Sequence, residues 1–230
     1  MRLLLVLVLA MAAASQADWA AAEDAWPTWP IKLVVPFAPG GNTDVVARLA
    51  ASYIQRAIKG ANVVIENKGG VGGIIGTDQV AKAAPDGYTF CVCSIGAITI
   101  SPATEKLPYD PLKDLAPVSL INTNPLVLIV HPAVPANSVA DVVALSKAQP
   151  DSLNYGSSGL GGLMYFSAEV FKAKTGANLV HVPYRGGAPA TAAVVAGDVH
   201  LAFANMSDAT AQMGAKTAQW AADLKNIAIK

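Results

Sequence analysis

The sequence predicts an α/β protein of two lobes, each a mostly parallel sheet flanked by helices. Short apolar runs that suit buried strands alternate with amphipathic segments that suit helices, in two successive rounds. A glycine-rich loop follows one strand in each round. We therefore expect a first lobe over residues 18–124 and a second lobe over 125–230, joined near 125–132.

Residues 1–17 have the features of a secretory signal sequence. Met1 and Arg2 precede the apolar run LLLVLVLAMAAA, and small residues follow it up to Ala17. The run is short for a permanent membrane anchor, although an uncleaved anchor is the alternative. We expect export to the periplasm with cleavage after Ala17, or after Ala22 as the second choice.

The charge balance argues against partners that are recognised by charge alone. Removal of residues 1–17 takes away Arg2 only, which leaves 15 basic and 16 acidic residues and a net charge of −1. Neither nucleic acid nor an anionic membrane surface is therefore an expected partner.

The cysteines and histidines show no spacing that predicts a metal or a cofactor. Cys91 and Cys93 form neither a redox CxxC motif nor a zinc-ligand set. We expect both to be small buried apolar residues, with an oxidised pair as the alternative in an exported protein. His131, His181 and His200 are expected to have structural roles.

The first round begins with a strand and an amphipathic helix. IKLVVPF (31–37) is a nearly continuous apolar run, as in a parallel strand covered on both faces. In the following helix, Val45, Leu49 and Tyr53 recur at helical spacing and are assigned to the core, and Gly60 ends the helix.

The remaining elements follow from the same patterns. In the first lobe they are strand 62–66, helix 74–84 and strand 88–94. The stretch LPYDPLKDLAPV (107–118) then interrupts the alternation with three prolines. The second round consists of strand 125–132, helix 138–149, strand 153–158, a helix through 168–176, strand 179–184, helix 189–197 and strand 199–205.

The loop PFAPGGNTD (36–44) is suited to anion binding. The carboxyl ends of parallel strands face ligands, and the next helix presents its N-terminus there. Gly40 and Gly41 leave no side chain in the way, so backbone N–H groups can point at an anion. Asn42 or Thr43 is expected to cap the helix, and Asp44 to point sideways, since it would repel an anionic ligand.

The second loop, NYGSSGLGG (154–162), repeats the arrangement. Ser157 and Ser158 add hydroxyl donors to the backbone amides. The frame from Gly156 to Leu160 lacks the final glycine of a nucleophile elbow, so a catalytic serine is not predicted. If the lobes face each other, two helix N-termini would close on one small anion.

Six ordered stretches resemble the periplasmic receptors of tripartite tricarboxylate transporters, often called Bug receptors. The stretches, WPIKLVVPFAPGGNTDVVAR, NKGGVGG, APDGYTF, LPYDPLKDLAPVSLI, NYGSSGLGG and HVPYRGGAPA, lie within residues 27–205. The resemblance implies a two-lobed solute-binding protein of the periplasmic type. Such a protein closes on a small organic carboxylate and delivers it to a membrane permease, without a cofactor and as a monomer.

The resemblance also implies a set of ligand-binding residues. For Gly72 and Gly73 the alternative is a purely structural turn, and for Arg185 it is a salt bridge at the rim of the cleft. Tyr165 stands where the family has a histidine, so a hydroxyl replaces a group that can become cationic. The implied residues are Phe37, Ala38, Gly40, Gly41, Asn42, Thr43, Asp44, Gly72, Gly73, Ser157, Ser158, Gly161, Gly162, Tyr165, Tyr184, Arg185, Gly186 and Asn205.

Two other functions stay open at this stage. Family chains continue beyond the counterpart of LKNIAIK (224–230), which resembles a strand that returns to the first lobe. An incomplete first lobe would make the chain a non-binding relic of a receptor. An α/β enzyme is the third alternative, although the sequence shows no base, nucleophile and metal set that would support it.

Overall fold

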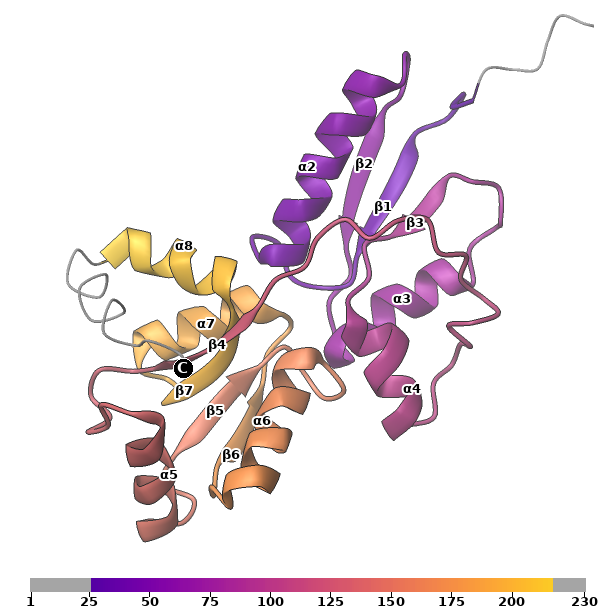
Figure 1. The fold of residues 1–230 in the computed structure, drawn as a ribbon. Helices are drawn as coiled ribbons and strands as arrows, with labels where there is room; N and C mark the ends of the chain where they lie inside the picture. The colour runs from indigo at the N-terminus through magenta and orange to yellow at the C-terminus, as the bar shows by residue number, and fades with distance from the viewer. Residues whose placement is uncertain (1–25, 217–230) are drawn as a thin grey trace, which may run out of the picture.

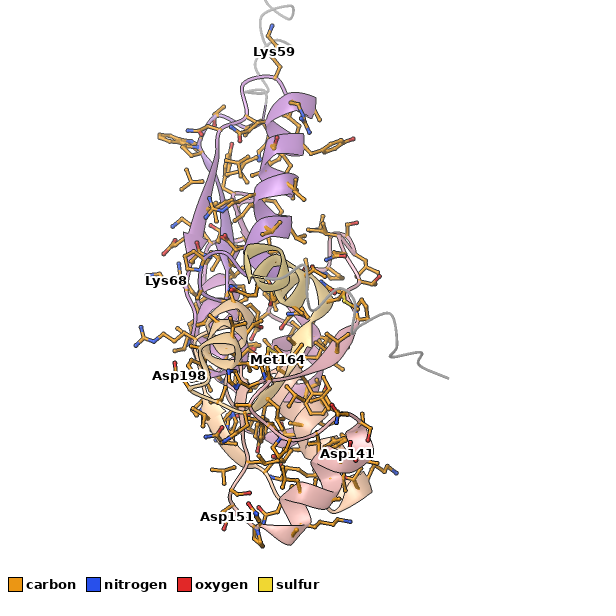
Figure 2. The ribbon with its side chains drawn as sticks, turned by 90° about the vertical axis from the view of Figure 1, so that its left-hand side faces the viewer. Lys59, Lys68, Asp141, Asp151, Met164 and Asp198 are labelled. Carbon is orange, nitrogen blue, oxygen red and sulfur yellow. A yellow bond between two sulfur atoms is a disulfide. The ribbon has the colours of Figure 1, made fainter. Side chains whose placement is uncertain are left out.

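The structure is a computed structural model that describes residues 26–216 as two lobes (Figure 1). The molecule is elongated, with Lys59 near the far end of the first lobe and Asp151 near that of the second (Figure 2). The predicted signal sequence and the predicted return strand at 224–230 lie outside the described residues.

The first lobe contains a three-stranded parallel sheet with the order β2-β1-β3. Leu33 in the central strand lies opposite Ile65 on one side and Phe90 on the other. The strands are β1 (Ile31–Val35), β2 (Val63–Asn67) and β3 (Thr89–Cys91). The helical elements are α2 (Asn42–Ala57), a 3-10 turn at Val71–Gly73, α3 (Ile74–Ala81), a π-helical turn at Gly96–Ile100 and α4 (Ser101–Thr104).

The second lobe contains a four-stranded sheet with the order β4-β7-β5-β6. Only β4 runs antiparallel, against β7. The strands are β4 (Leu126–Val130), β5 (Asn154–Ser157), β6 (Val180–Pro183) and β7 (Leu201–Asn205). The helices are α5 (Val139–Ala148), α6 (Leu163–Thr175), α7 (Gly187–Ala196) and α8 (Met206–Lys216).

The predicted fold class is confirmed, since two parallel-dominated sheets carry helices on their faces (Figure 1). No regular element occupies residues 105–125 within the described range, where prolines interrupt the pattern. The π-helical turn, α4 and α8 were not predicted from the sequence. The lobe boundaries at 124 and 125 remain predictions.

The assignment of one apolar stripe of α2 to the core was wrong. Val45, Leu49 and Tyr53 are 49%, 66% and 68% exposed, whereas Ala47 and Ala51 face the sheet at 0% and 5%. The small alanine side chains let the helix lie close to the strands, and the larger stripe then faces outward.

The predicted side-chain cap of α2 was also wrong. The helix begins at Asn42 with Gly41 as N-cap, and no side chain caps it. The Asn42 side chain instead contacts the start of α8 and the segment that leads into β4, where its Oδ1 accepts hydrogen bonds from Asn124 Nδ2 (2.8 Å) and Ser207 Oγ (3.0 Å).

Cys91 and Cys93 form a disulfide, so the preferred interpretation of two reduced buried residues was wrong and the alternative holds. The predicted strand 88–94 stops at Cys91. Val92 N still donates to Val34 O (2.9 Å), so the extended backbone continues past the end of β3 and places the two cysteines on the same face, with their Cα atoms 5.2 Å apart. Both residues are half-buried.

Asp44 stabilises the loop between β1 and α2. Its buried carboxylate accepts hydrogen bonds from Gly40 N (2.9 Å), Asn67 Nδ2 (2.9 Å) and Arg48 Nε (2.9 Å). The side chain therefore turns back onto its own lobe. Burial alone would raise the pKa of Asp44, but hydrogen bonds from Arg48, Gly40 and Asn67 outweigh it and lower the pKa below 3.8.

We predict that Asp44→Ala lowers the free energy of unfolding by roughly 2 to 4 kcal/mol at pH 7, because the hydrogen-bond network around this buried carboxylate is lost and the Gly40, Asn67 and Arg48 donors lose their acceptor. Since the native pKa of Asp44 is depressed, its contribution is complete above pH 3.8 and is lost as the pH falls further. Urea denaturation at pH 7 and pH 3 measures both effects. A similar loss for Asp198→Asn, which changes an exposed carboxylate, would contradict the prediction.

Candidate functional site

The predicted ligand loops meet at the junction of the lobes, where backbone contacts join them. Ala38 N donates to Arg185 O (2.9 Å), and Ser101 Oγ donates to Gly161 O (3.3 Å). The first bond connects a loop of each lobe, and the second connects the start of α4 in the first lobe with a loop of the second. The candidate site is therefore an interlobe junction.

Glycines make this close approach possible. A Cβ atom on Gly72, whose φ is +60°, would collide with the Leu160 carbonyl and lie 2.5 Å from Gly162 N. On the opposite loop, a Cβ on Gly161 would lie 2.5 Å from Glu105 Oε1. Gly72, Gly161 and Gly162 thus form the contact itself. Gly73 lies beside Phe37, and a Cβ there would be 3.1 Å from the Phe37 ring.

Backbone amides of the first-lobe loop donate hydrogen bonds to side chains of the protein. Gly40 N donates to Asp44 Oδ2 (2.9 Å), and Asn42 N donates to Asp208 Oδ1 (2.7 Å). In this structure two amides of the loop predicted to bind an anion therefore donate to carboxylates of the protein. Gly41 lies against α7, with Ala188 N 3.6 Å from the position of an added Cβ.

A buried hydrogen-bond network supports the second-lobe loop. Ser157 Oγ lies 2.6 Å from His181 Nε2 and accepts a hydrogen bond from Gly159 N (3.1 Å). Burial lowers the pKa of His181, which favours the neutral form of the imidazole that shares this hydrogen bond with Ser157. The ring of Tyr165 packs on the same imidazole, with centroids 4.7 Å apart. Ser157 and Tyr165 therefore support the loop through His181 and through the loop backbone. Ser158 is also buried.

A cavity of about 310 Å³ opens at the edge of the junction. It contains one cation from each lobe, Lys68 and the exposed Arg185. Lys68 Nζ also pairs with Glu66 Oε1 at 3.3 Å. The complete lining is Phe37, Ala38, Pro39, Asn67, Lys68, Gly69 and Arg185. Charged donors on both sides of a small cavity suit an anionic ligand.

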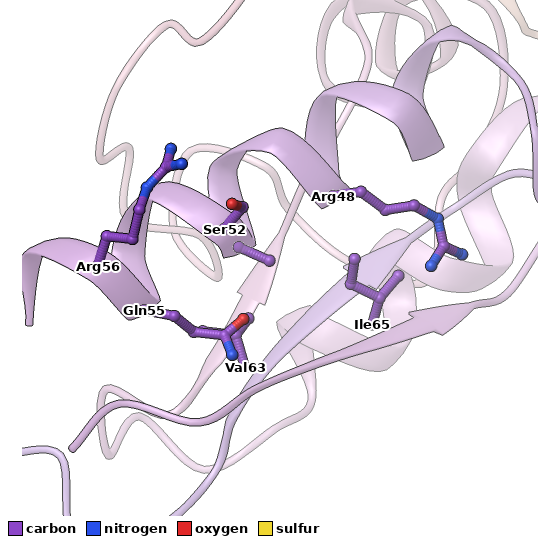
Figure 3. Close-up of a pocket in the computed structure, with 7 residues that line it drawn as sticks. Arg48, Ser52, Gln55, Arg56, Val63 and Ile65 are labelled. Atoms are coloured by element: carbon purple, nitrogen blue, oxygen red, sulfur yellow. The ribbon is translucent and has the colours of Figure 1, made fainter.

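A larger groove of about 480 Å³ lies away from the junction, on the flank of α2 and β2 (Figure 3). Arg48, Ser52, Gln55 and Arg56 line it from the helix, and Val63 and Ile65 line it from the strand. None of the ligand-binding residues predicted from the sequence lines this groove.

The predicted site residues thus fall into groups. Phe37, Ala38 and Arg185 line the cavity, and Gly186 packs against Ala38 at its edge. Thr43 and Tyr184 are half-buried, with no hydrogen bond from either side chain among the described residues. Asn205 donates to Asp208 at 3.2 Å.

Sequence reasoning missed Lys68 and Asp208. Lys68 stands inside the quoted motif NKGGVGG, so its position next to the glycines was a usable signal. Asp208 follows a strand of the second lobe and meets a helix of the first, and no local pattern reports that contact.

Within the described residues no group of His, Cys, Asp and Glu side chains could hold a metal ion. No helix in residues 26–216 is long and apolar enough to cross a membrane.

Comparison with known proteins identifies relatives of the chain. A family profile described as "Tripartite tricarboxylate transporter family receptor" matches residues 46–221. A UPF0065 protein of Bordetella pertussis is 39% identical over 216 residues, which cover 94% of this chain and 65% of the relative. The chain thus spans slightly less than two thirds of the length of this curated relative.

Two similar solved structures have ligands in their descriptions. Rpa4515 of R. palustris with adipate is 38% identical, with a TM-score of 0.77 over 83% of this chain and 64% of the other. MatC (Rpa3494) of Rhodopseudomonas palustris with bound malate is 32% identical, with a TM-score of 0.78 over 83% and 65%.

We predict that Gly72→Ala separates the lobes, because the added methyl group collides with the backbone of the opposite loop. Small-angle scattering would show a larger radius of gyration than for the wild type. Gly60→Ala is the control, since Gly60 also has a positive φ (+82°) but has no neighbouring atom within 4 Å of an added Cβ. An equal change in both variants would mean that the Gly72 contact does not hold the lobes together.

Proposed function

The chain belongs to the tripartite tricarboxylate transporter receptor family, and on this premise we propose that it binds a small organic carboxylate at the junction of its lobes. The observation that supports the proposal most directly is the cavity lined by Lys68 from one lobe and Arg185 from the other. A ligand that bridges the two cations would join the lobes.

The chemistry of the cavity favours a carboxylate. Arg185 presents a planar guanidinium that can bind a carboxylate through two parallel hydrogen bonds, and Lys68 adds a compact positive charge. Asn67 donates to the Phe37 carbonyl, which fixes the backbone that forms the first wall. A few charge-assisted hydrogen bonds at roughly 1.5 to 3 kcal/mol each can supply the roughly 8 kcal/mol of micromolar binding.

A dicarboxylate of four to six carbons is the ligand class that we favour. Adipate and malate, found with the two similar structures, have a carboxylate at each end of a short chain. In this protein a second carboxylate would lie between the loop Phe37–Asp44 of the first lobe and the loop Ser157–Gly162 of the second.

Export and delivery complete the proposal. A secretory signal at residues 1–17 would place the receptor in the periplasm, as a monomer that presents its ligand to a tripartite tricarboxylate-type permease. Family membership supports this role, because such receptors work with membrane transporters.

One observation bears on the alternative of an enzyme. Ser157 Oγ and His181 Nε2 are 2.6 Å apart, which is the separation of a nucleophile and its base. Ser157 is fully buried, however, and its oxygen already accepts from Gly159 N. A buried hydroxyl that supports its own loop fits a binding protein better than a hydrolase.

We predict that Arg185→Met weakens adipate or malate binding about tenfold or more, because one or two charge-assisted hydrogen bonds are lost. Isothermal titration calorimetry measures the affinity. Arg56→Met is the control, since Arg56 lies in the flank groove away from the junction, and it should bind as the wild type does. Equal affinity in all three proteins would exclude Arg185 from the site, and release of a reaction product would favour an enzyme.

A further inference from the structure

Asp208 is a buried carboxylate that connects the two lobes. It lies in the first turn of α8, directly after the second-lobe strand β7, and is 5% exposed. Its Oδ1 accepts a hydrogen bond of 2.7 Å from the amide of Asn42, the first residue of α2 in the other lobe. Its Oδ2 accepts from Asn205 Nδ2 at 3.2 Å.

The same carboxylate lies against a second helix N-terminus. Gly187 is the first residue of α7, and a Cβ there would collide with Asp208 Oδ2. The start of α2 is nearby as well, since an added Cβ on Gly41 would lie 3.6 Å from Ala188 N. The N-termini of α2 and α7, from opposite lobes, therefore approach each other with the carboxylate of Asp208 between them.

Electrostatics explain why an anion is favourable at this point. Each helix N-terminus has a partial positive charge and unpaired amides, so two of them repel unless an anion lies between them. Asp44, the other buried aspartate at the junction, has a counter-charge, because it pairs with Arg48 at 2.9 Å. Asp208 forms no ion pair with the described residues.

A carboxylate in this position is costly for the fold. Burial raises the pKa of Asp208, and the hydrogen bonds from Asn205 and Asn42 offset only part of that effect. An asparagine here could accept the hydrogen bond from the Asn42 amide through its side-chain oxygen without the desolvation of a charge. The charge therefore fits a role at the junction better than a role in stability alone.

We propose that Asp208 is a built-in substitute for a ligand carboxylate, which bridges α2 and α7, holds the two lobes together and must be displaced from Asn42 before a ligand carboxylate can bind there. This inference rests on the proposed function, and it makes Asp208 a residue that limits affinity. Binding then includes the free energy needed to release Asp208.

Removal of the side chain and its chemical replacement test the proposal. Asp208→Ala without additives should be more open than the wild type, with a larger radius of gyration in small-angle scattering. Acetate, which has the same carboxylate, should reduce that radius in the variant and leave the wild type unchanged. Acetamide, a neutral molecule of the same shape, should have no effect on either protein.

Affinity provides the second measurement. Asp208→Ala should bind adipate or malate roughly fivefold tighter or more, because no internal carboxylate competes. Asp141→Ala is the matched control, since Asp141 lies in the first turn of α5 (Figure 2) and its Oδ2 accepts from Asn137 N at 2.9 Å, within its own lobe. It should leave both the affinity and the scattering unchanged.

The contrary outcomes are distinct. If Asp208→Ala has the wild-type radius of gyration without acetate, the carboxylate does not hold the lobes and the proposal fails. If Asp208→Ala does not fold, Asp208→Asn keeps the shape without the charge, and wild-type scattering and affinity in that variant would overturn the proposal. If no protein binds adipate or malate, the proposed function fails, and the scattering with acetate still decides the role of Asp208.

Discussion

Direct backbone contact between two glycine loops is the constraint on which the arrangement of the lobes depends. Gly72 of the first lobe lies against Leu160 and Gly162 of the second without room for a side chain. Since no side chain fits between these loops, the contact sets how closely the lobes approach each other at this point. This approach brings Arg185 and Lys68 to one cavity and places the start of α7 opposite the start of α2.

The two buried aspartates at the junction show different solutions to the same problem. Asp44 belongs to the loop that it stabilises, and Arg48 one helical turn later supplies a counter-charge. Asp208 crosses to the other lobe and receives only amide donors. The carboxylate of Asp44 therefore stabilises the loop of one lobe, whereas the carboxylate of Asp208 makes the contact between the lobes depend on an anion.

The sequence predicted the strand-helix alternation because buried parallel strands such as Ile31–Val35 are apolar without interruption. It did not predict which stripe of α2 faces the sheet. The stripe that contains Ala47 and the stripe that contains the exposed Leu49 recur with the same helical spacing, and only the distance between helix and sheet distinguishes them. The loops that form the junction were identified from their glycines. Asp208 was missed because its partner, Asn42, is 166 residues away in the chain.

The central claim is that the folded chain recognises a small carboxylate. The most direct measurement is a thermal melt of the purified protein, followed by tryptophan fluorescence, with adipate, malate and their neutral diamides. The account predicts a cooperative transition that a dicarboxylate raises and its diamide does not, because a ligand selective for the native state stabilises it. A broad transition that no carboxylate shifts would contradict the account and would favour a chain that keeps the form of a receptor without its function.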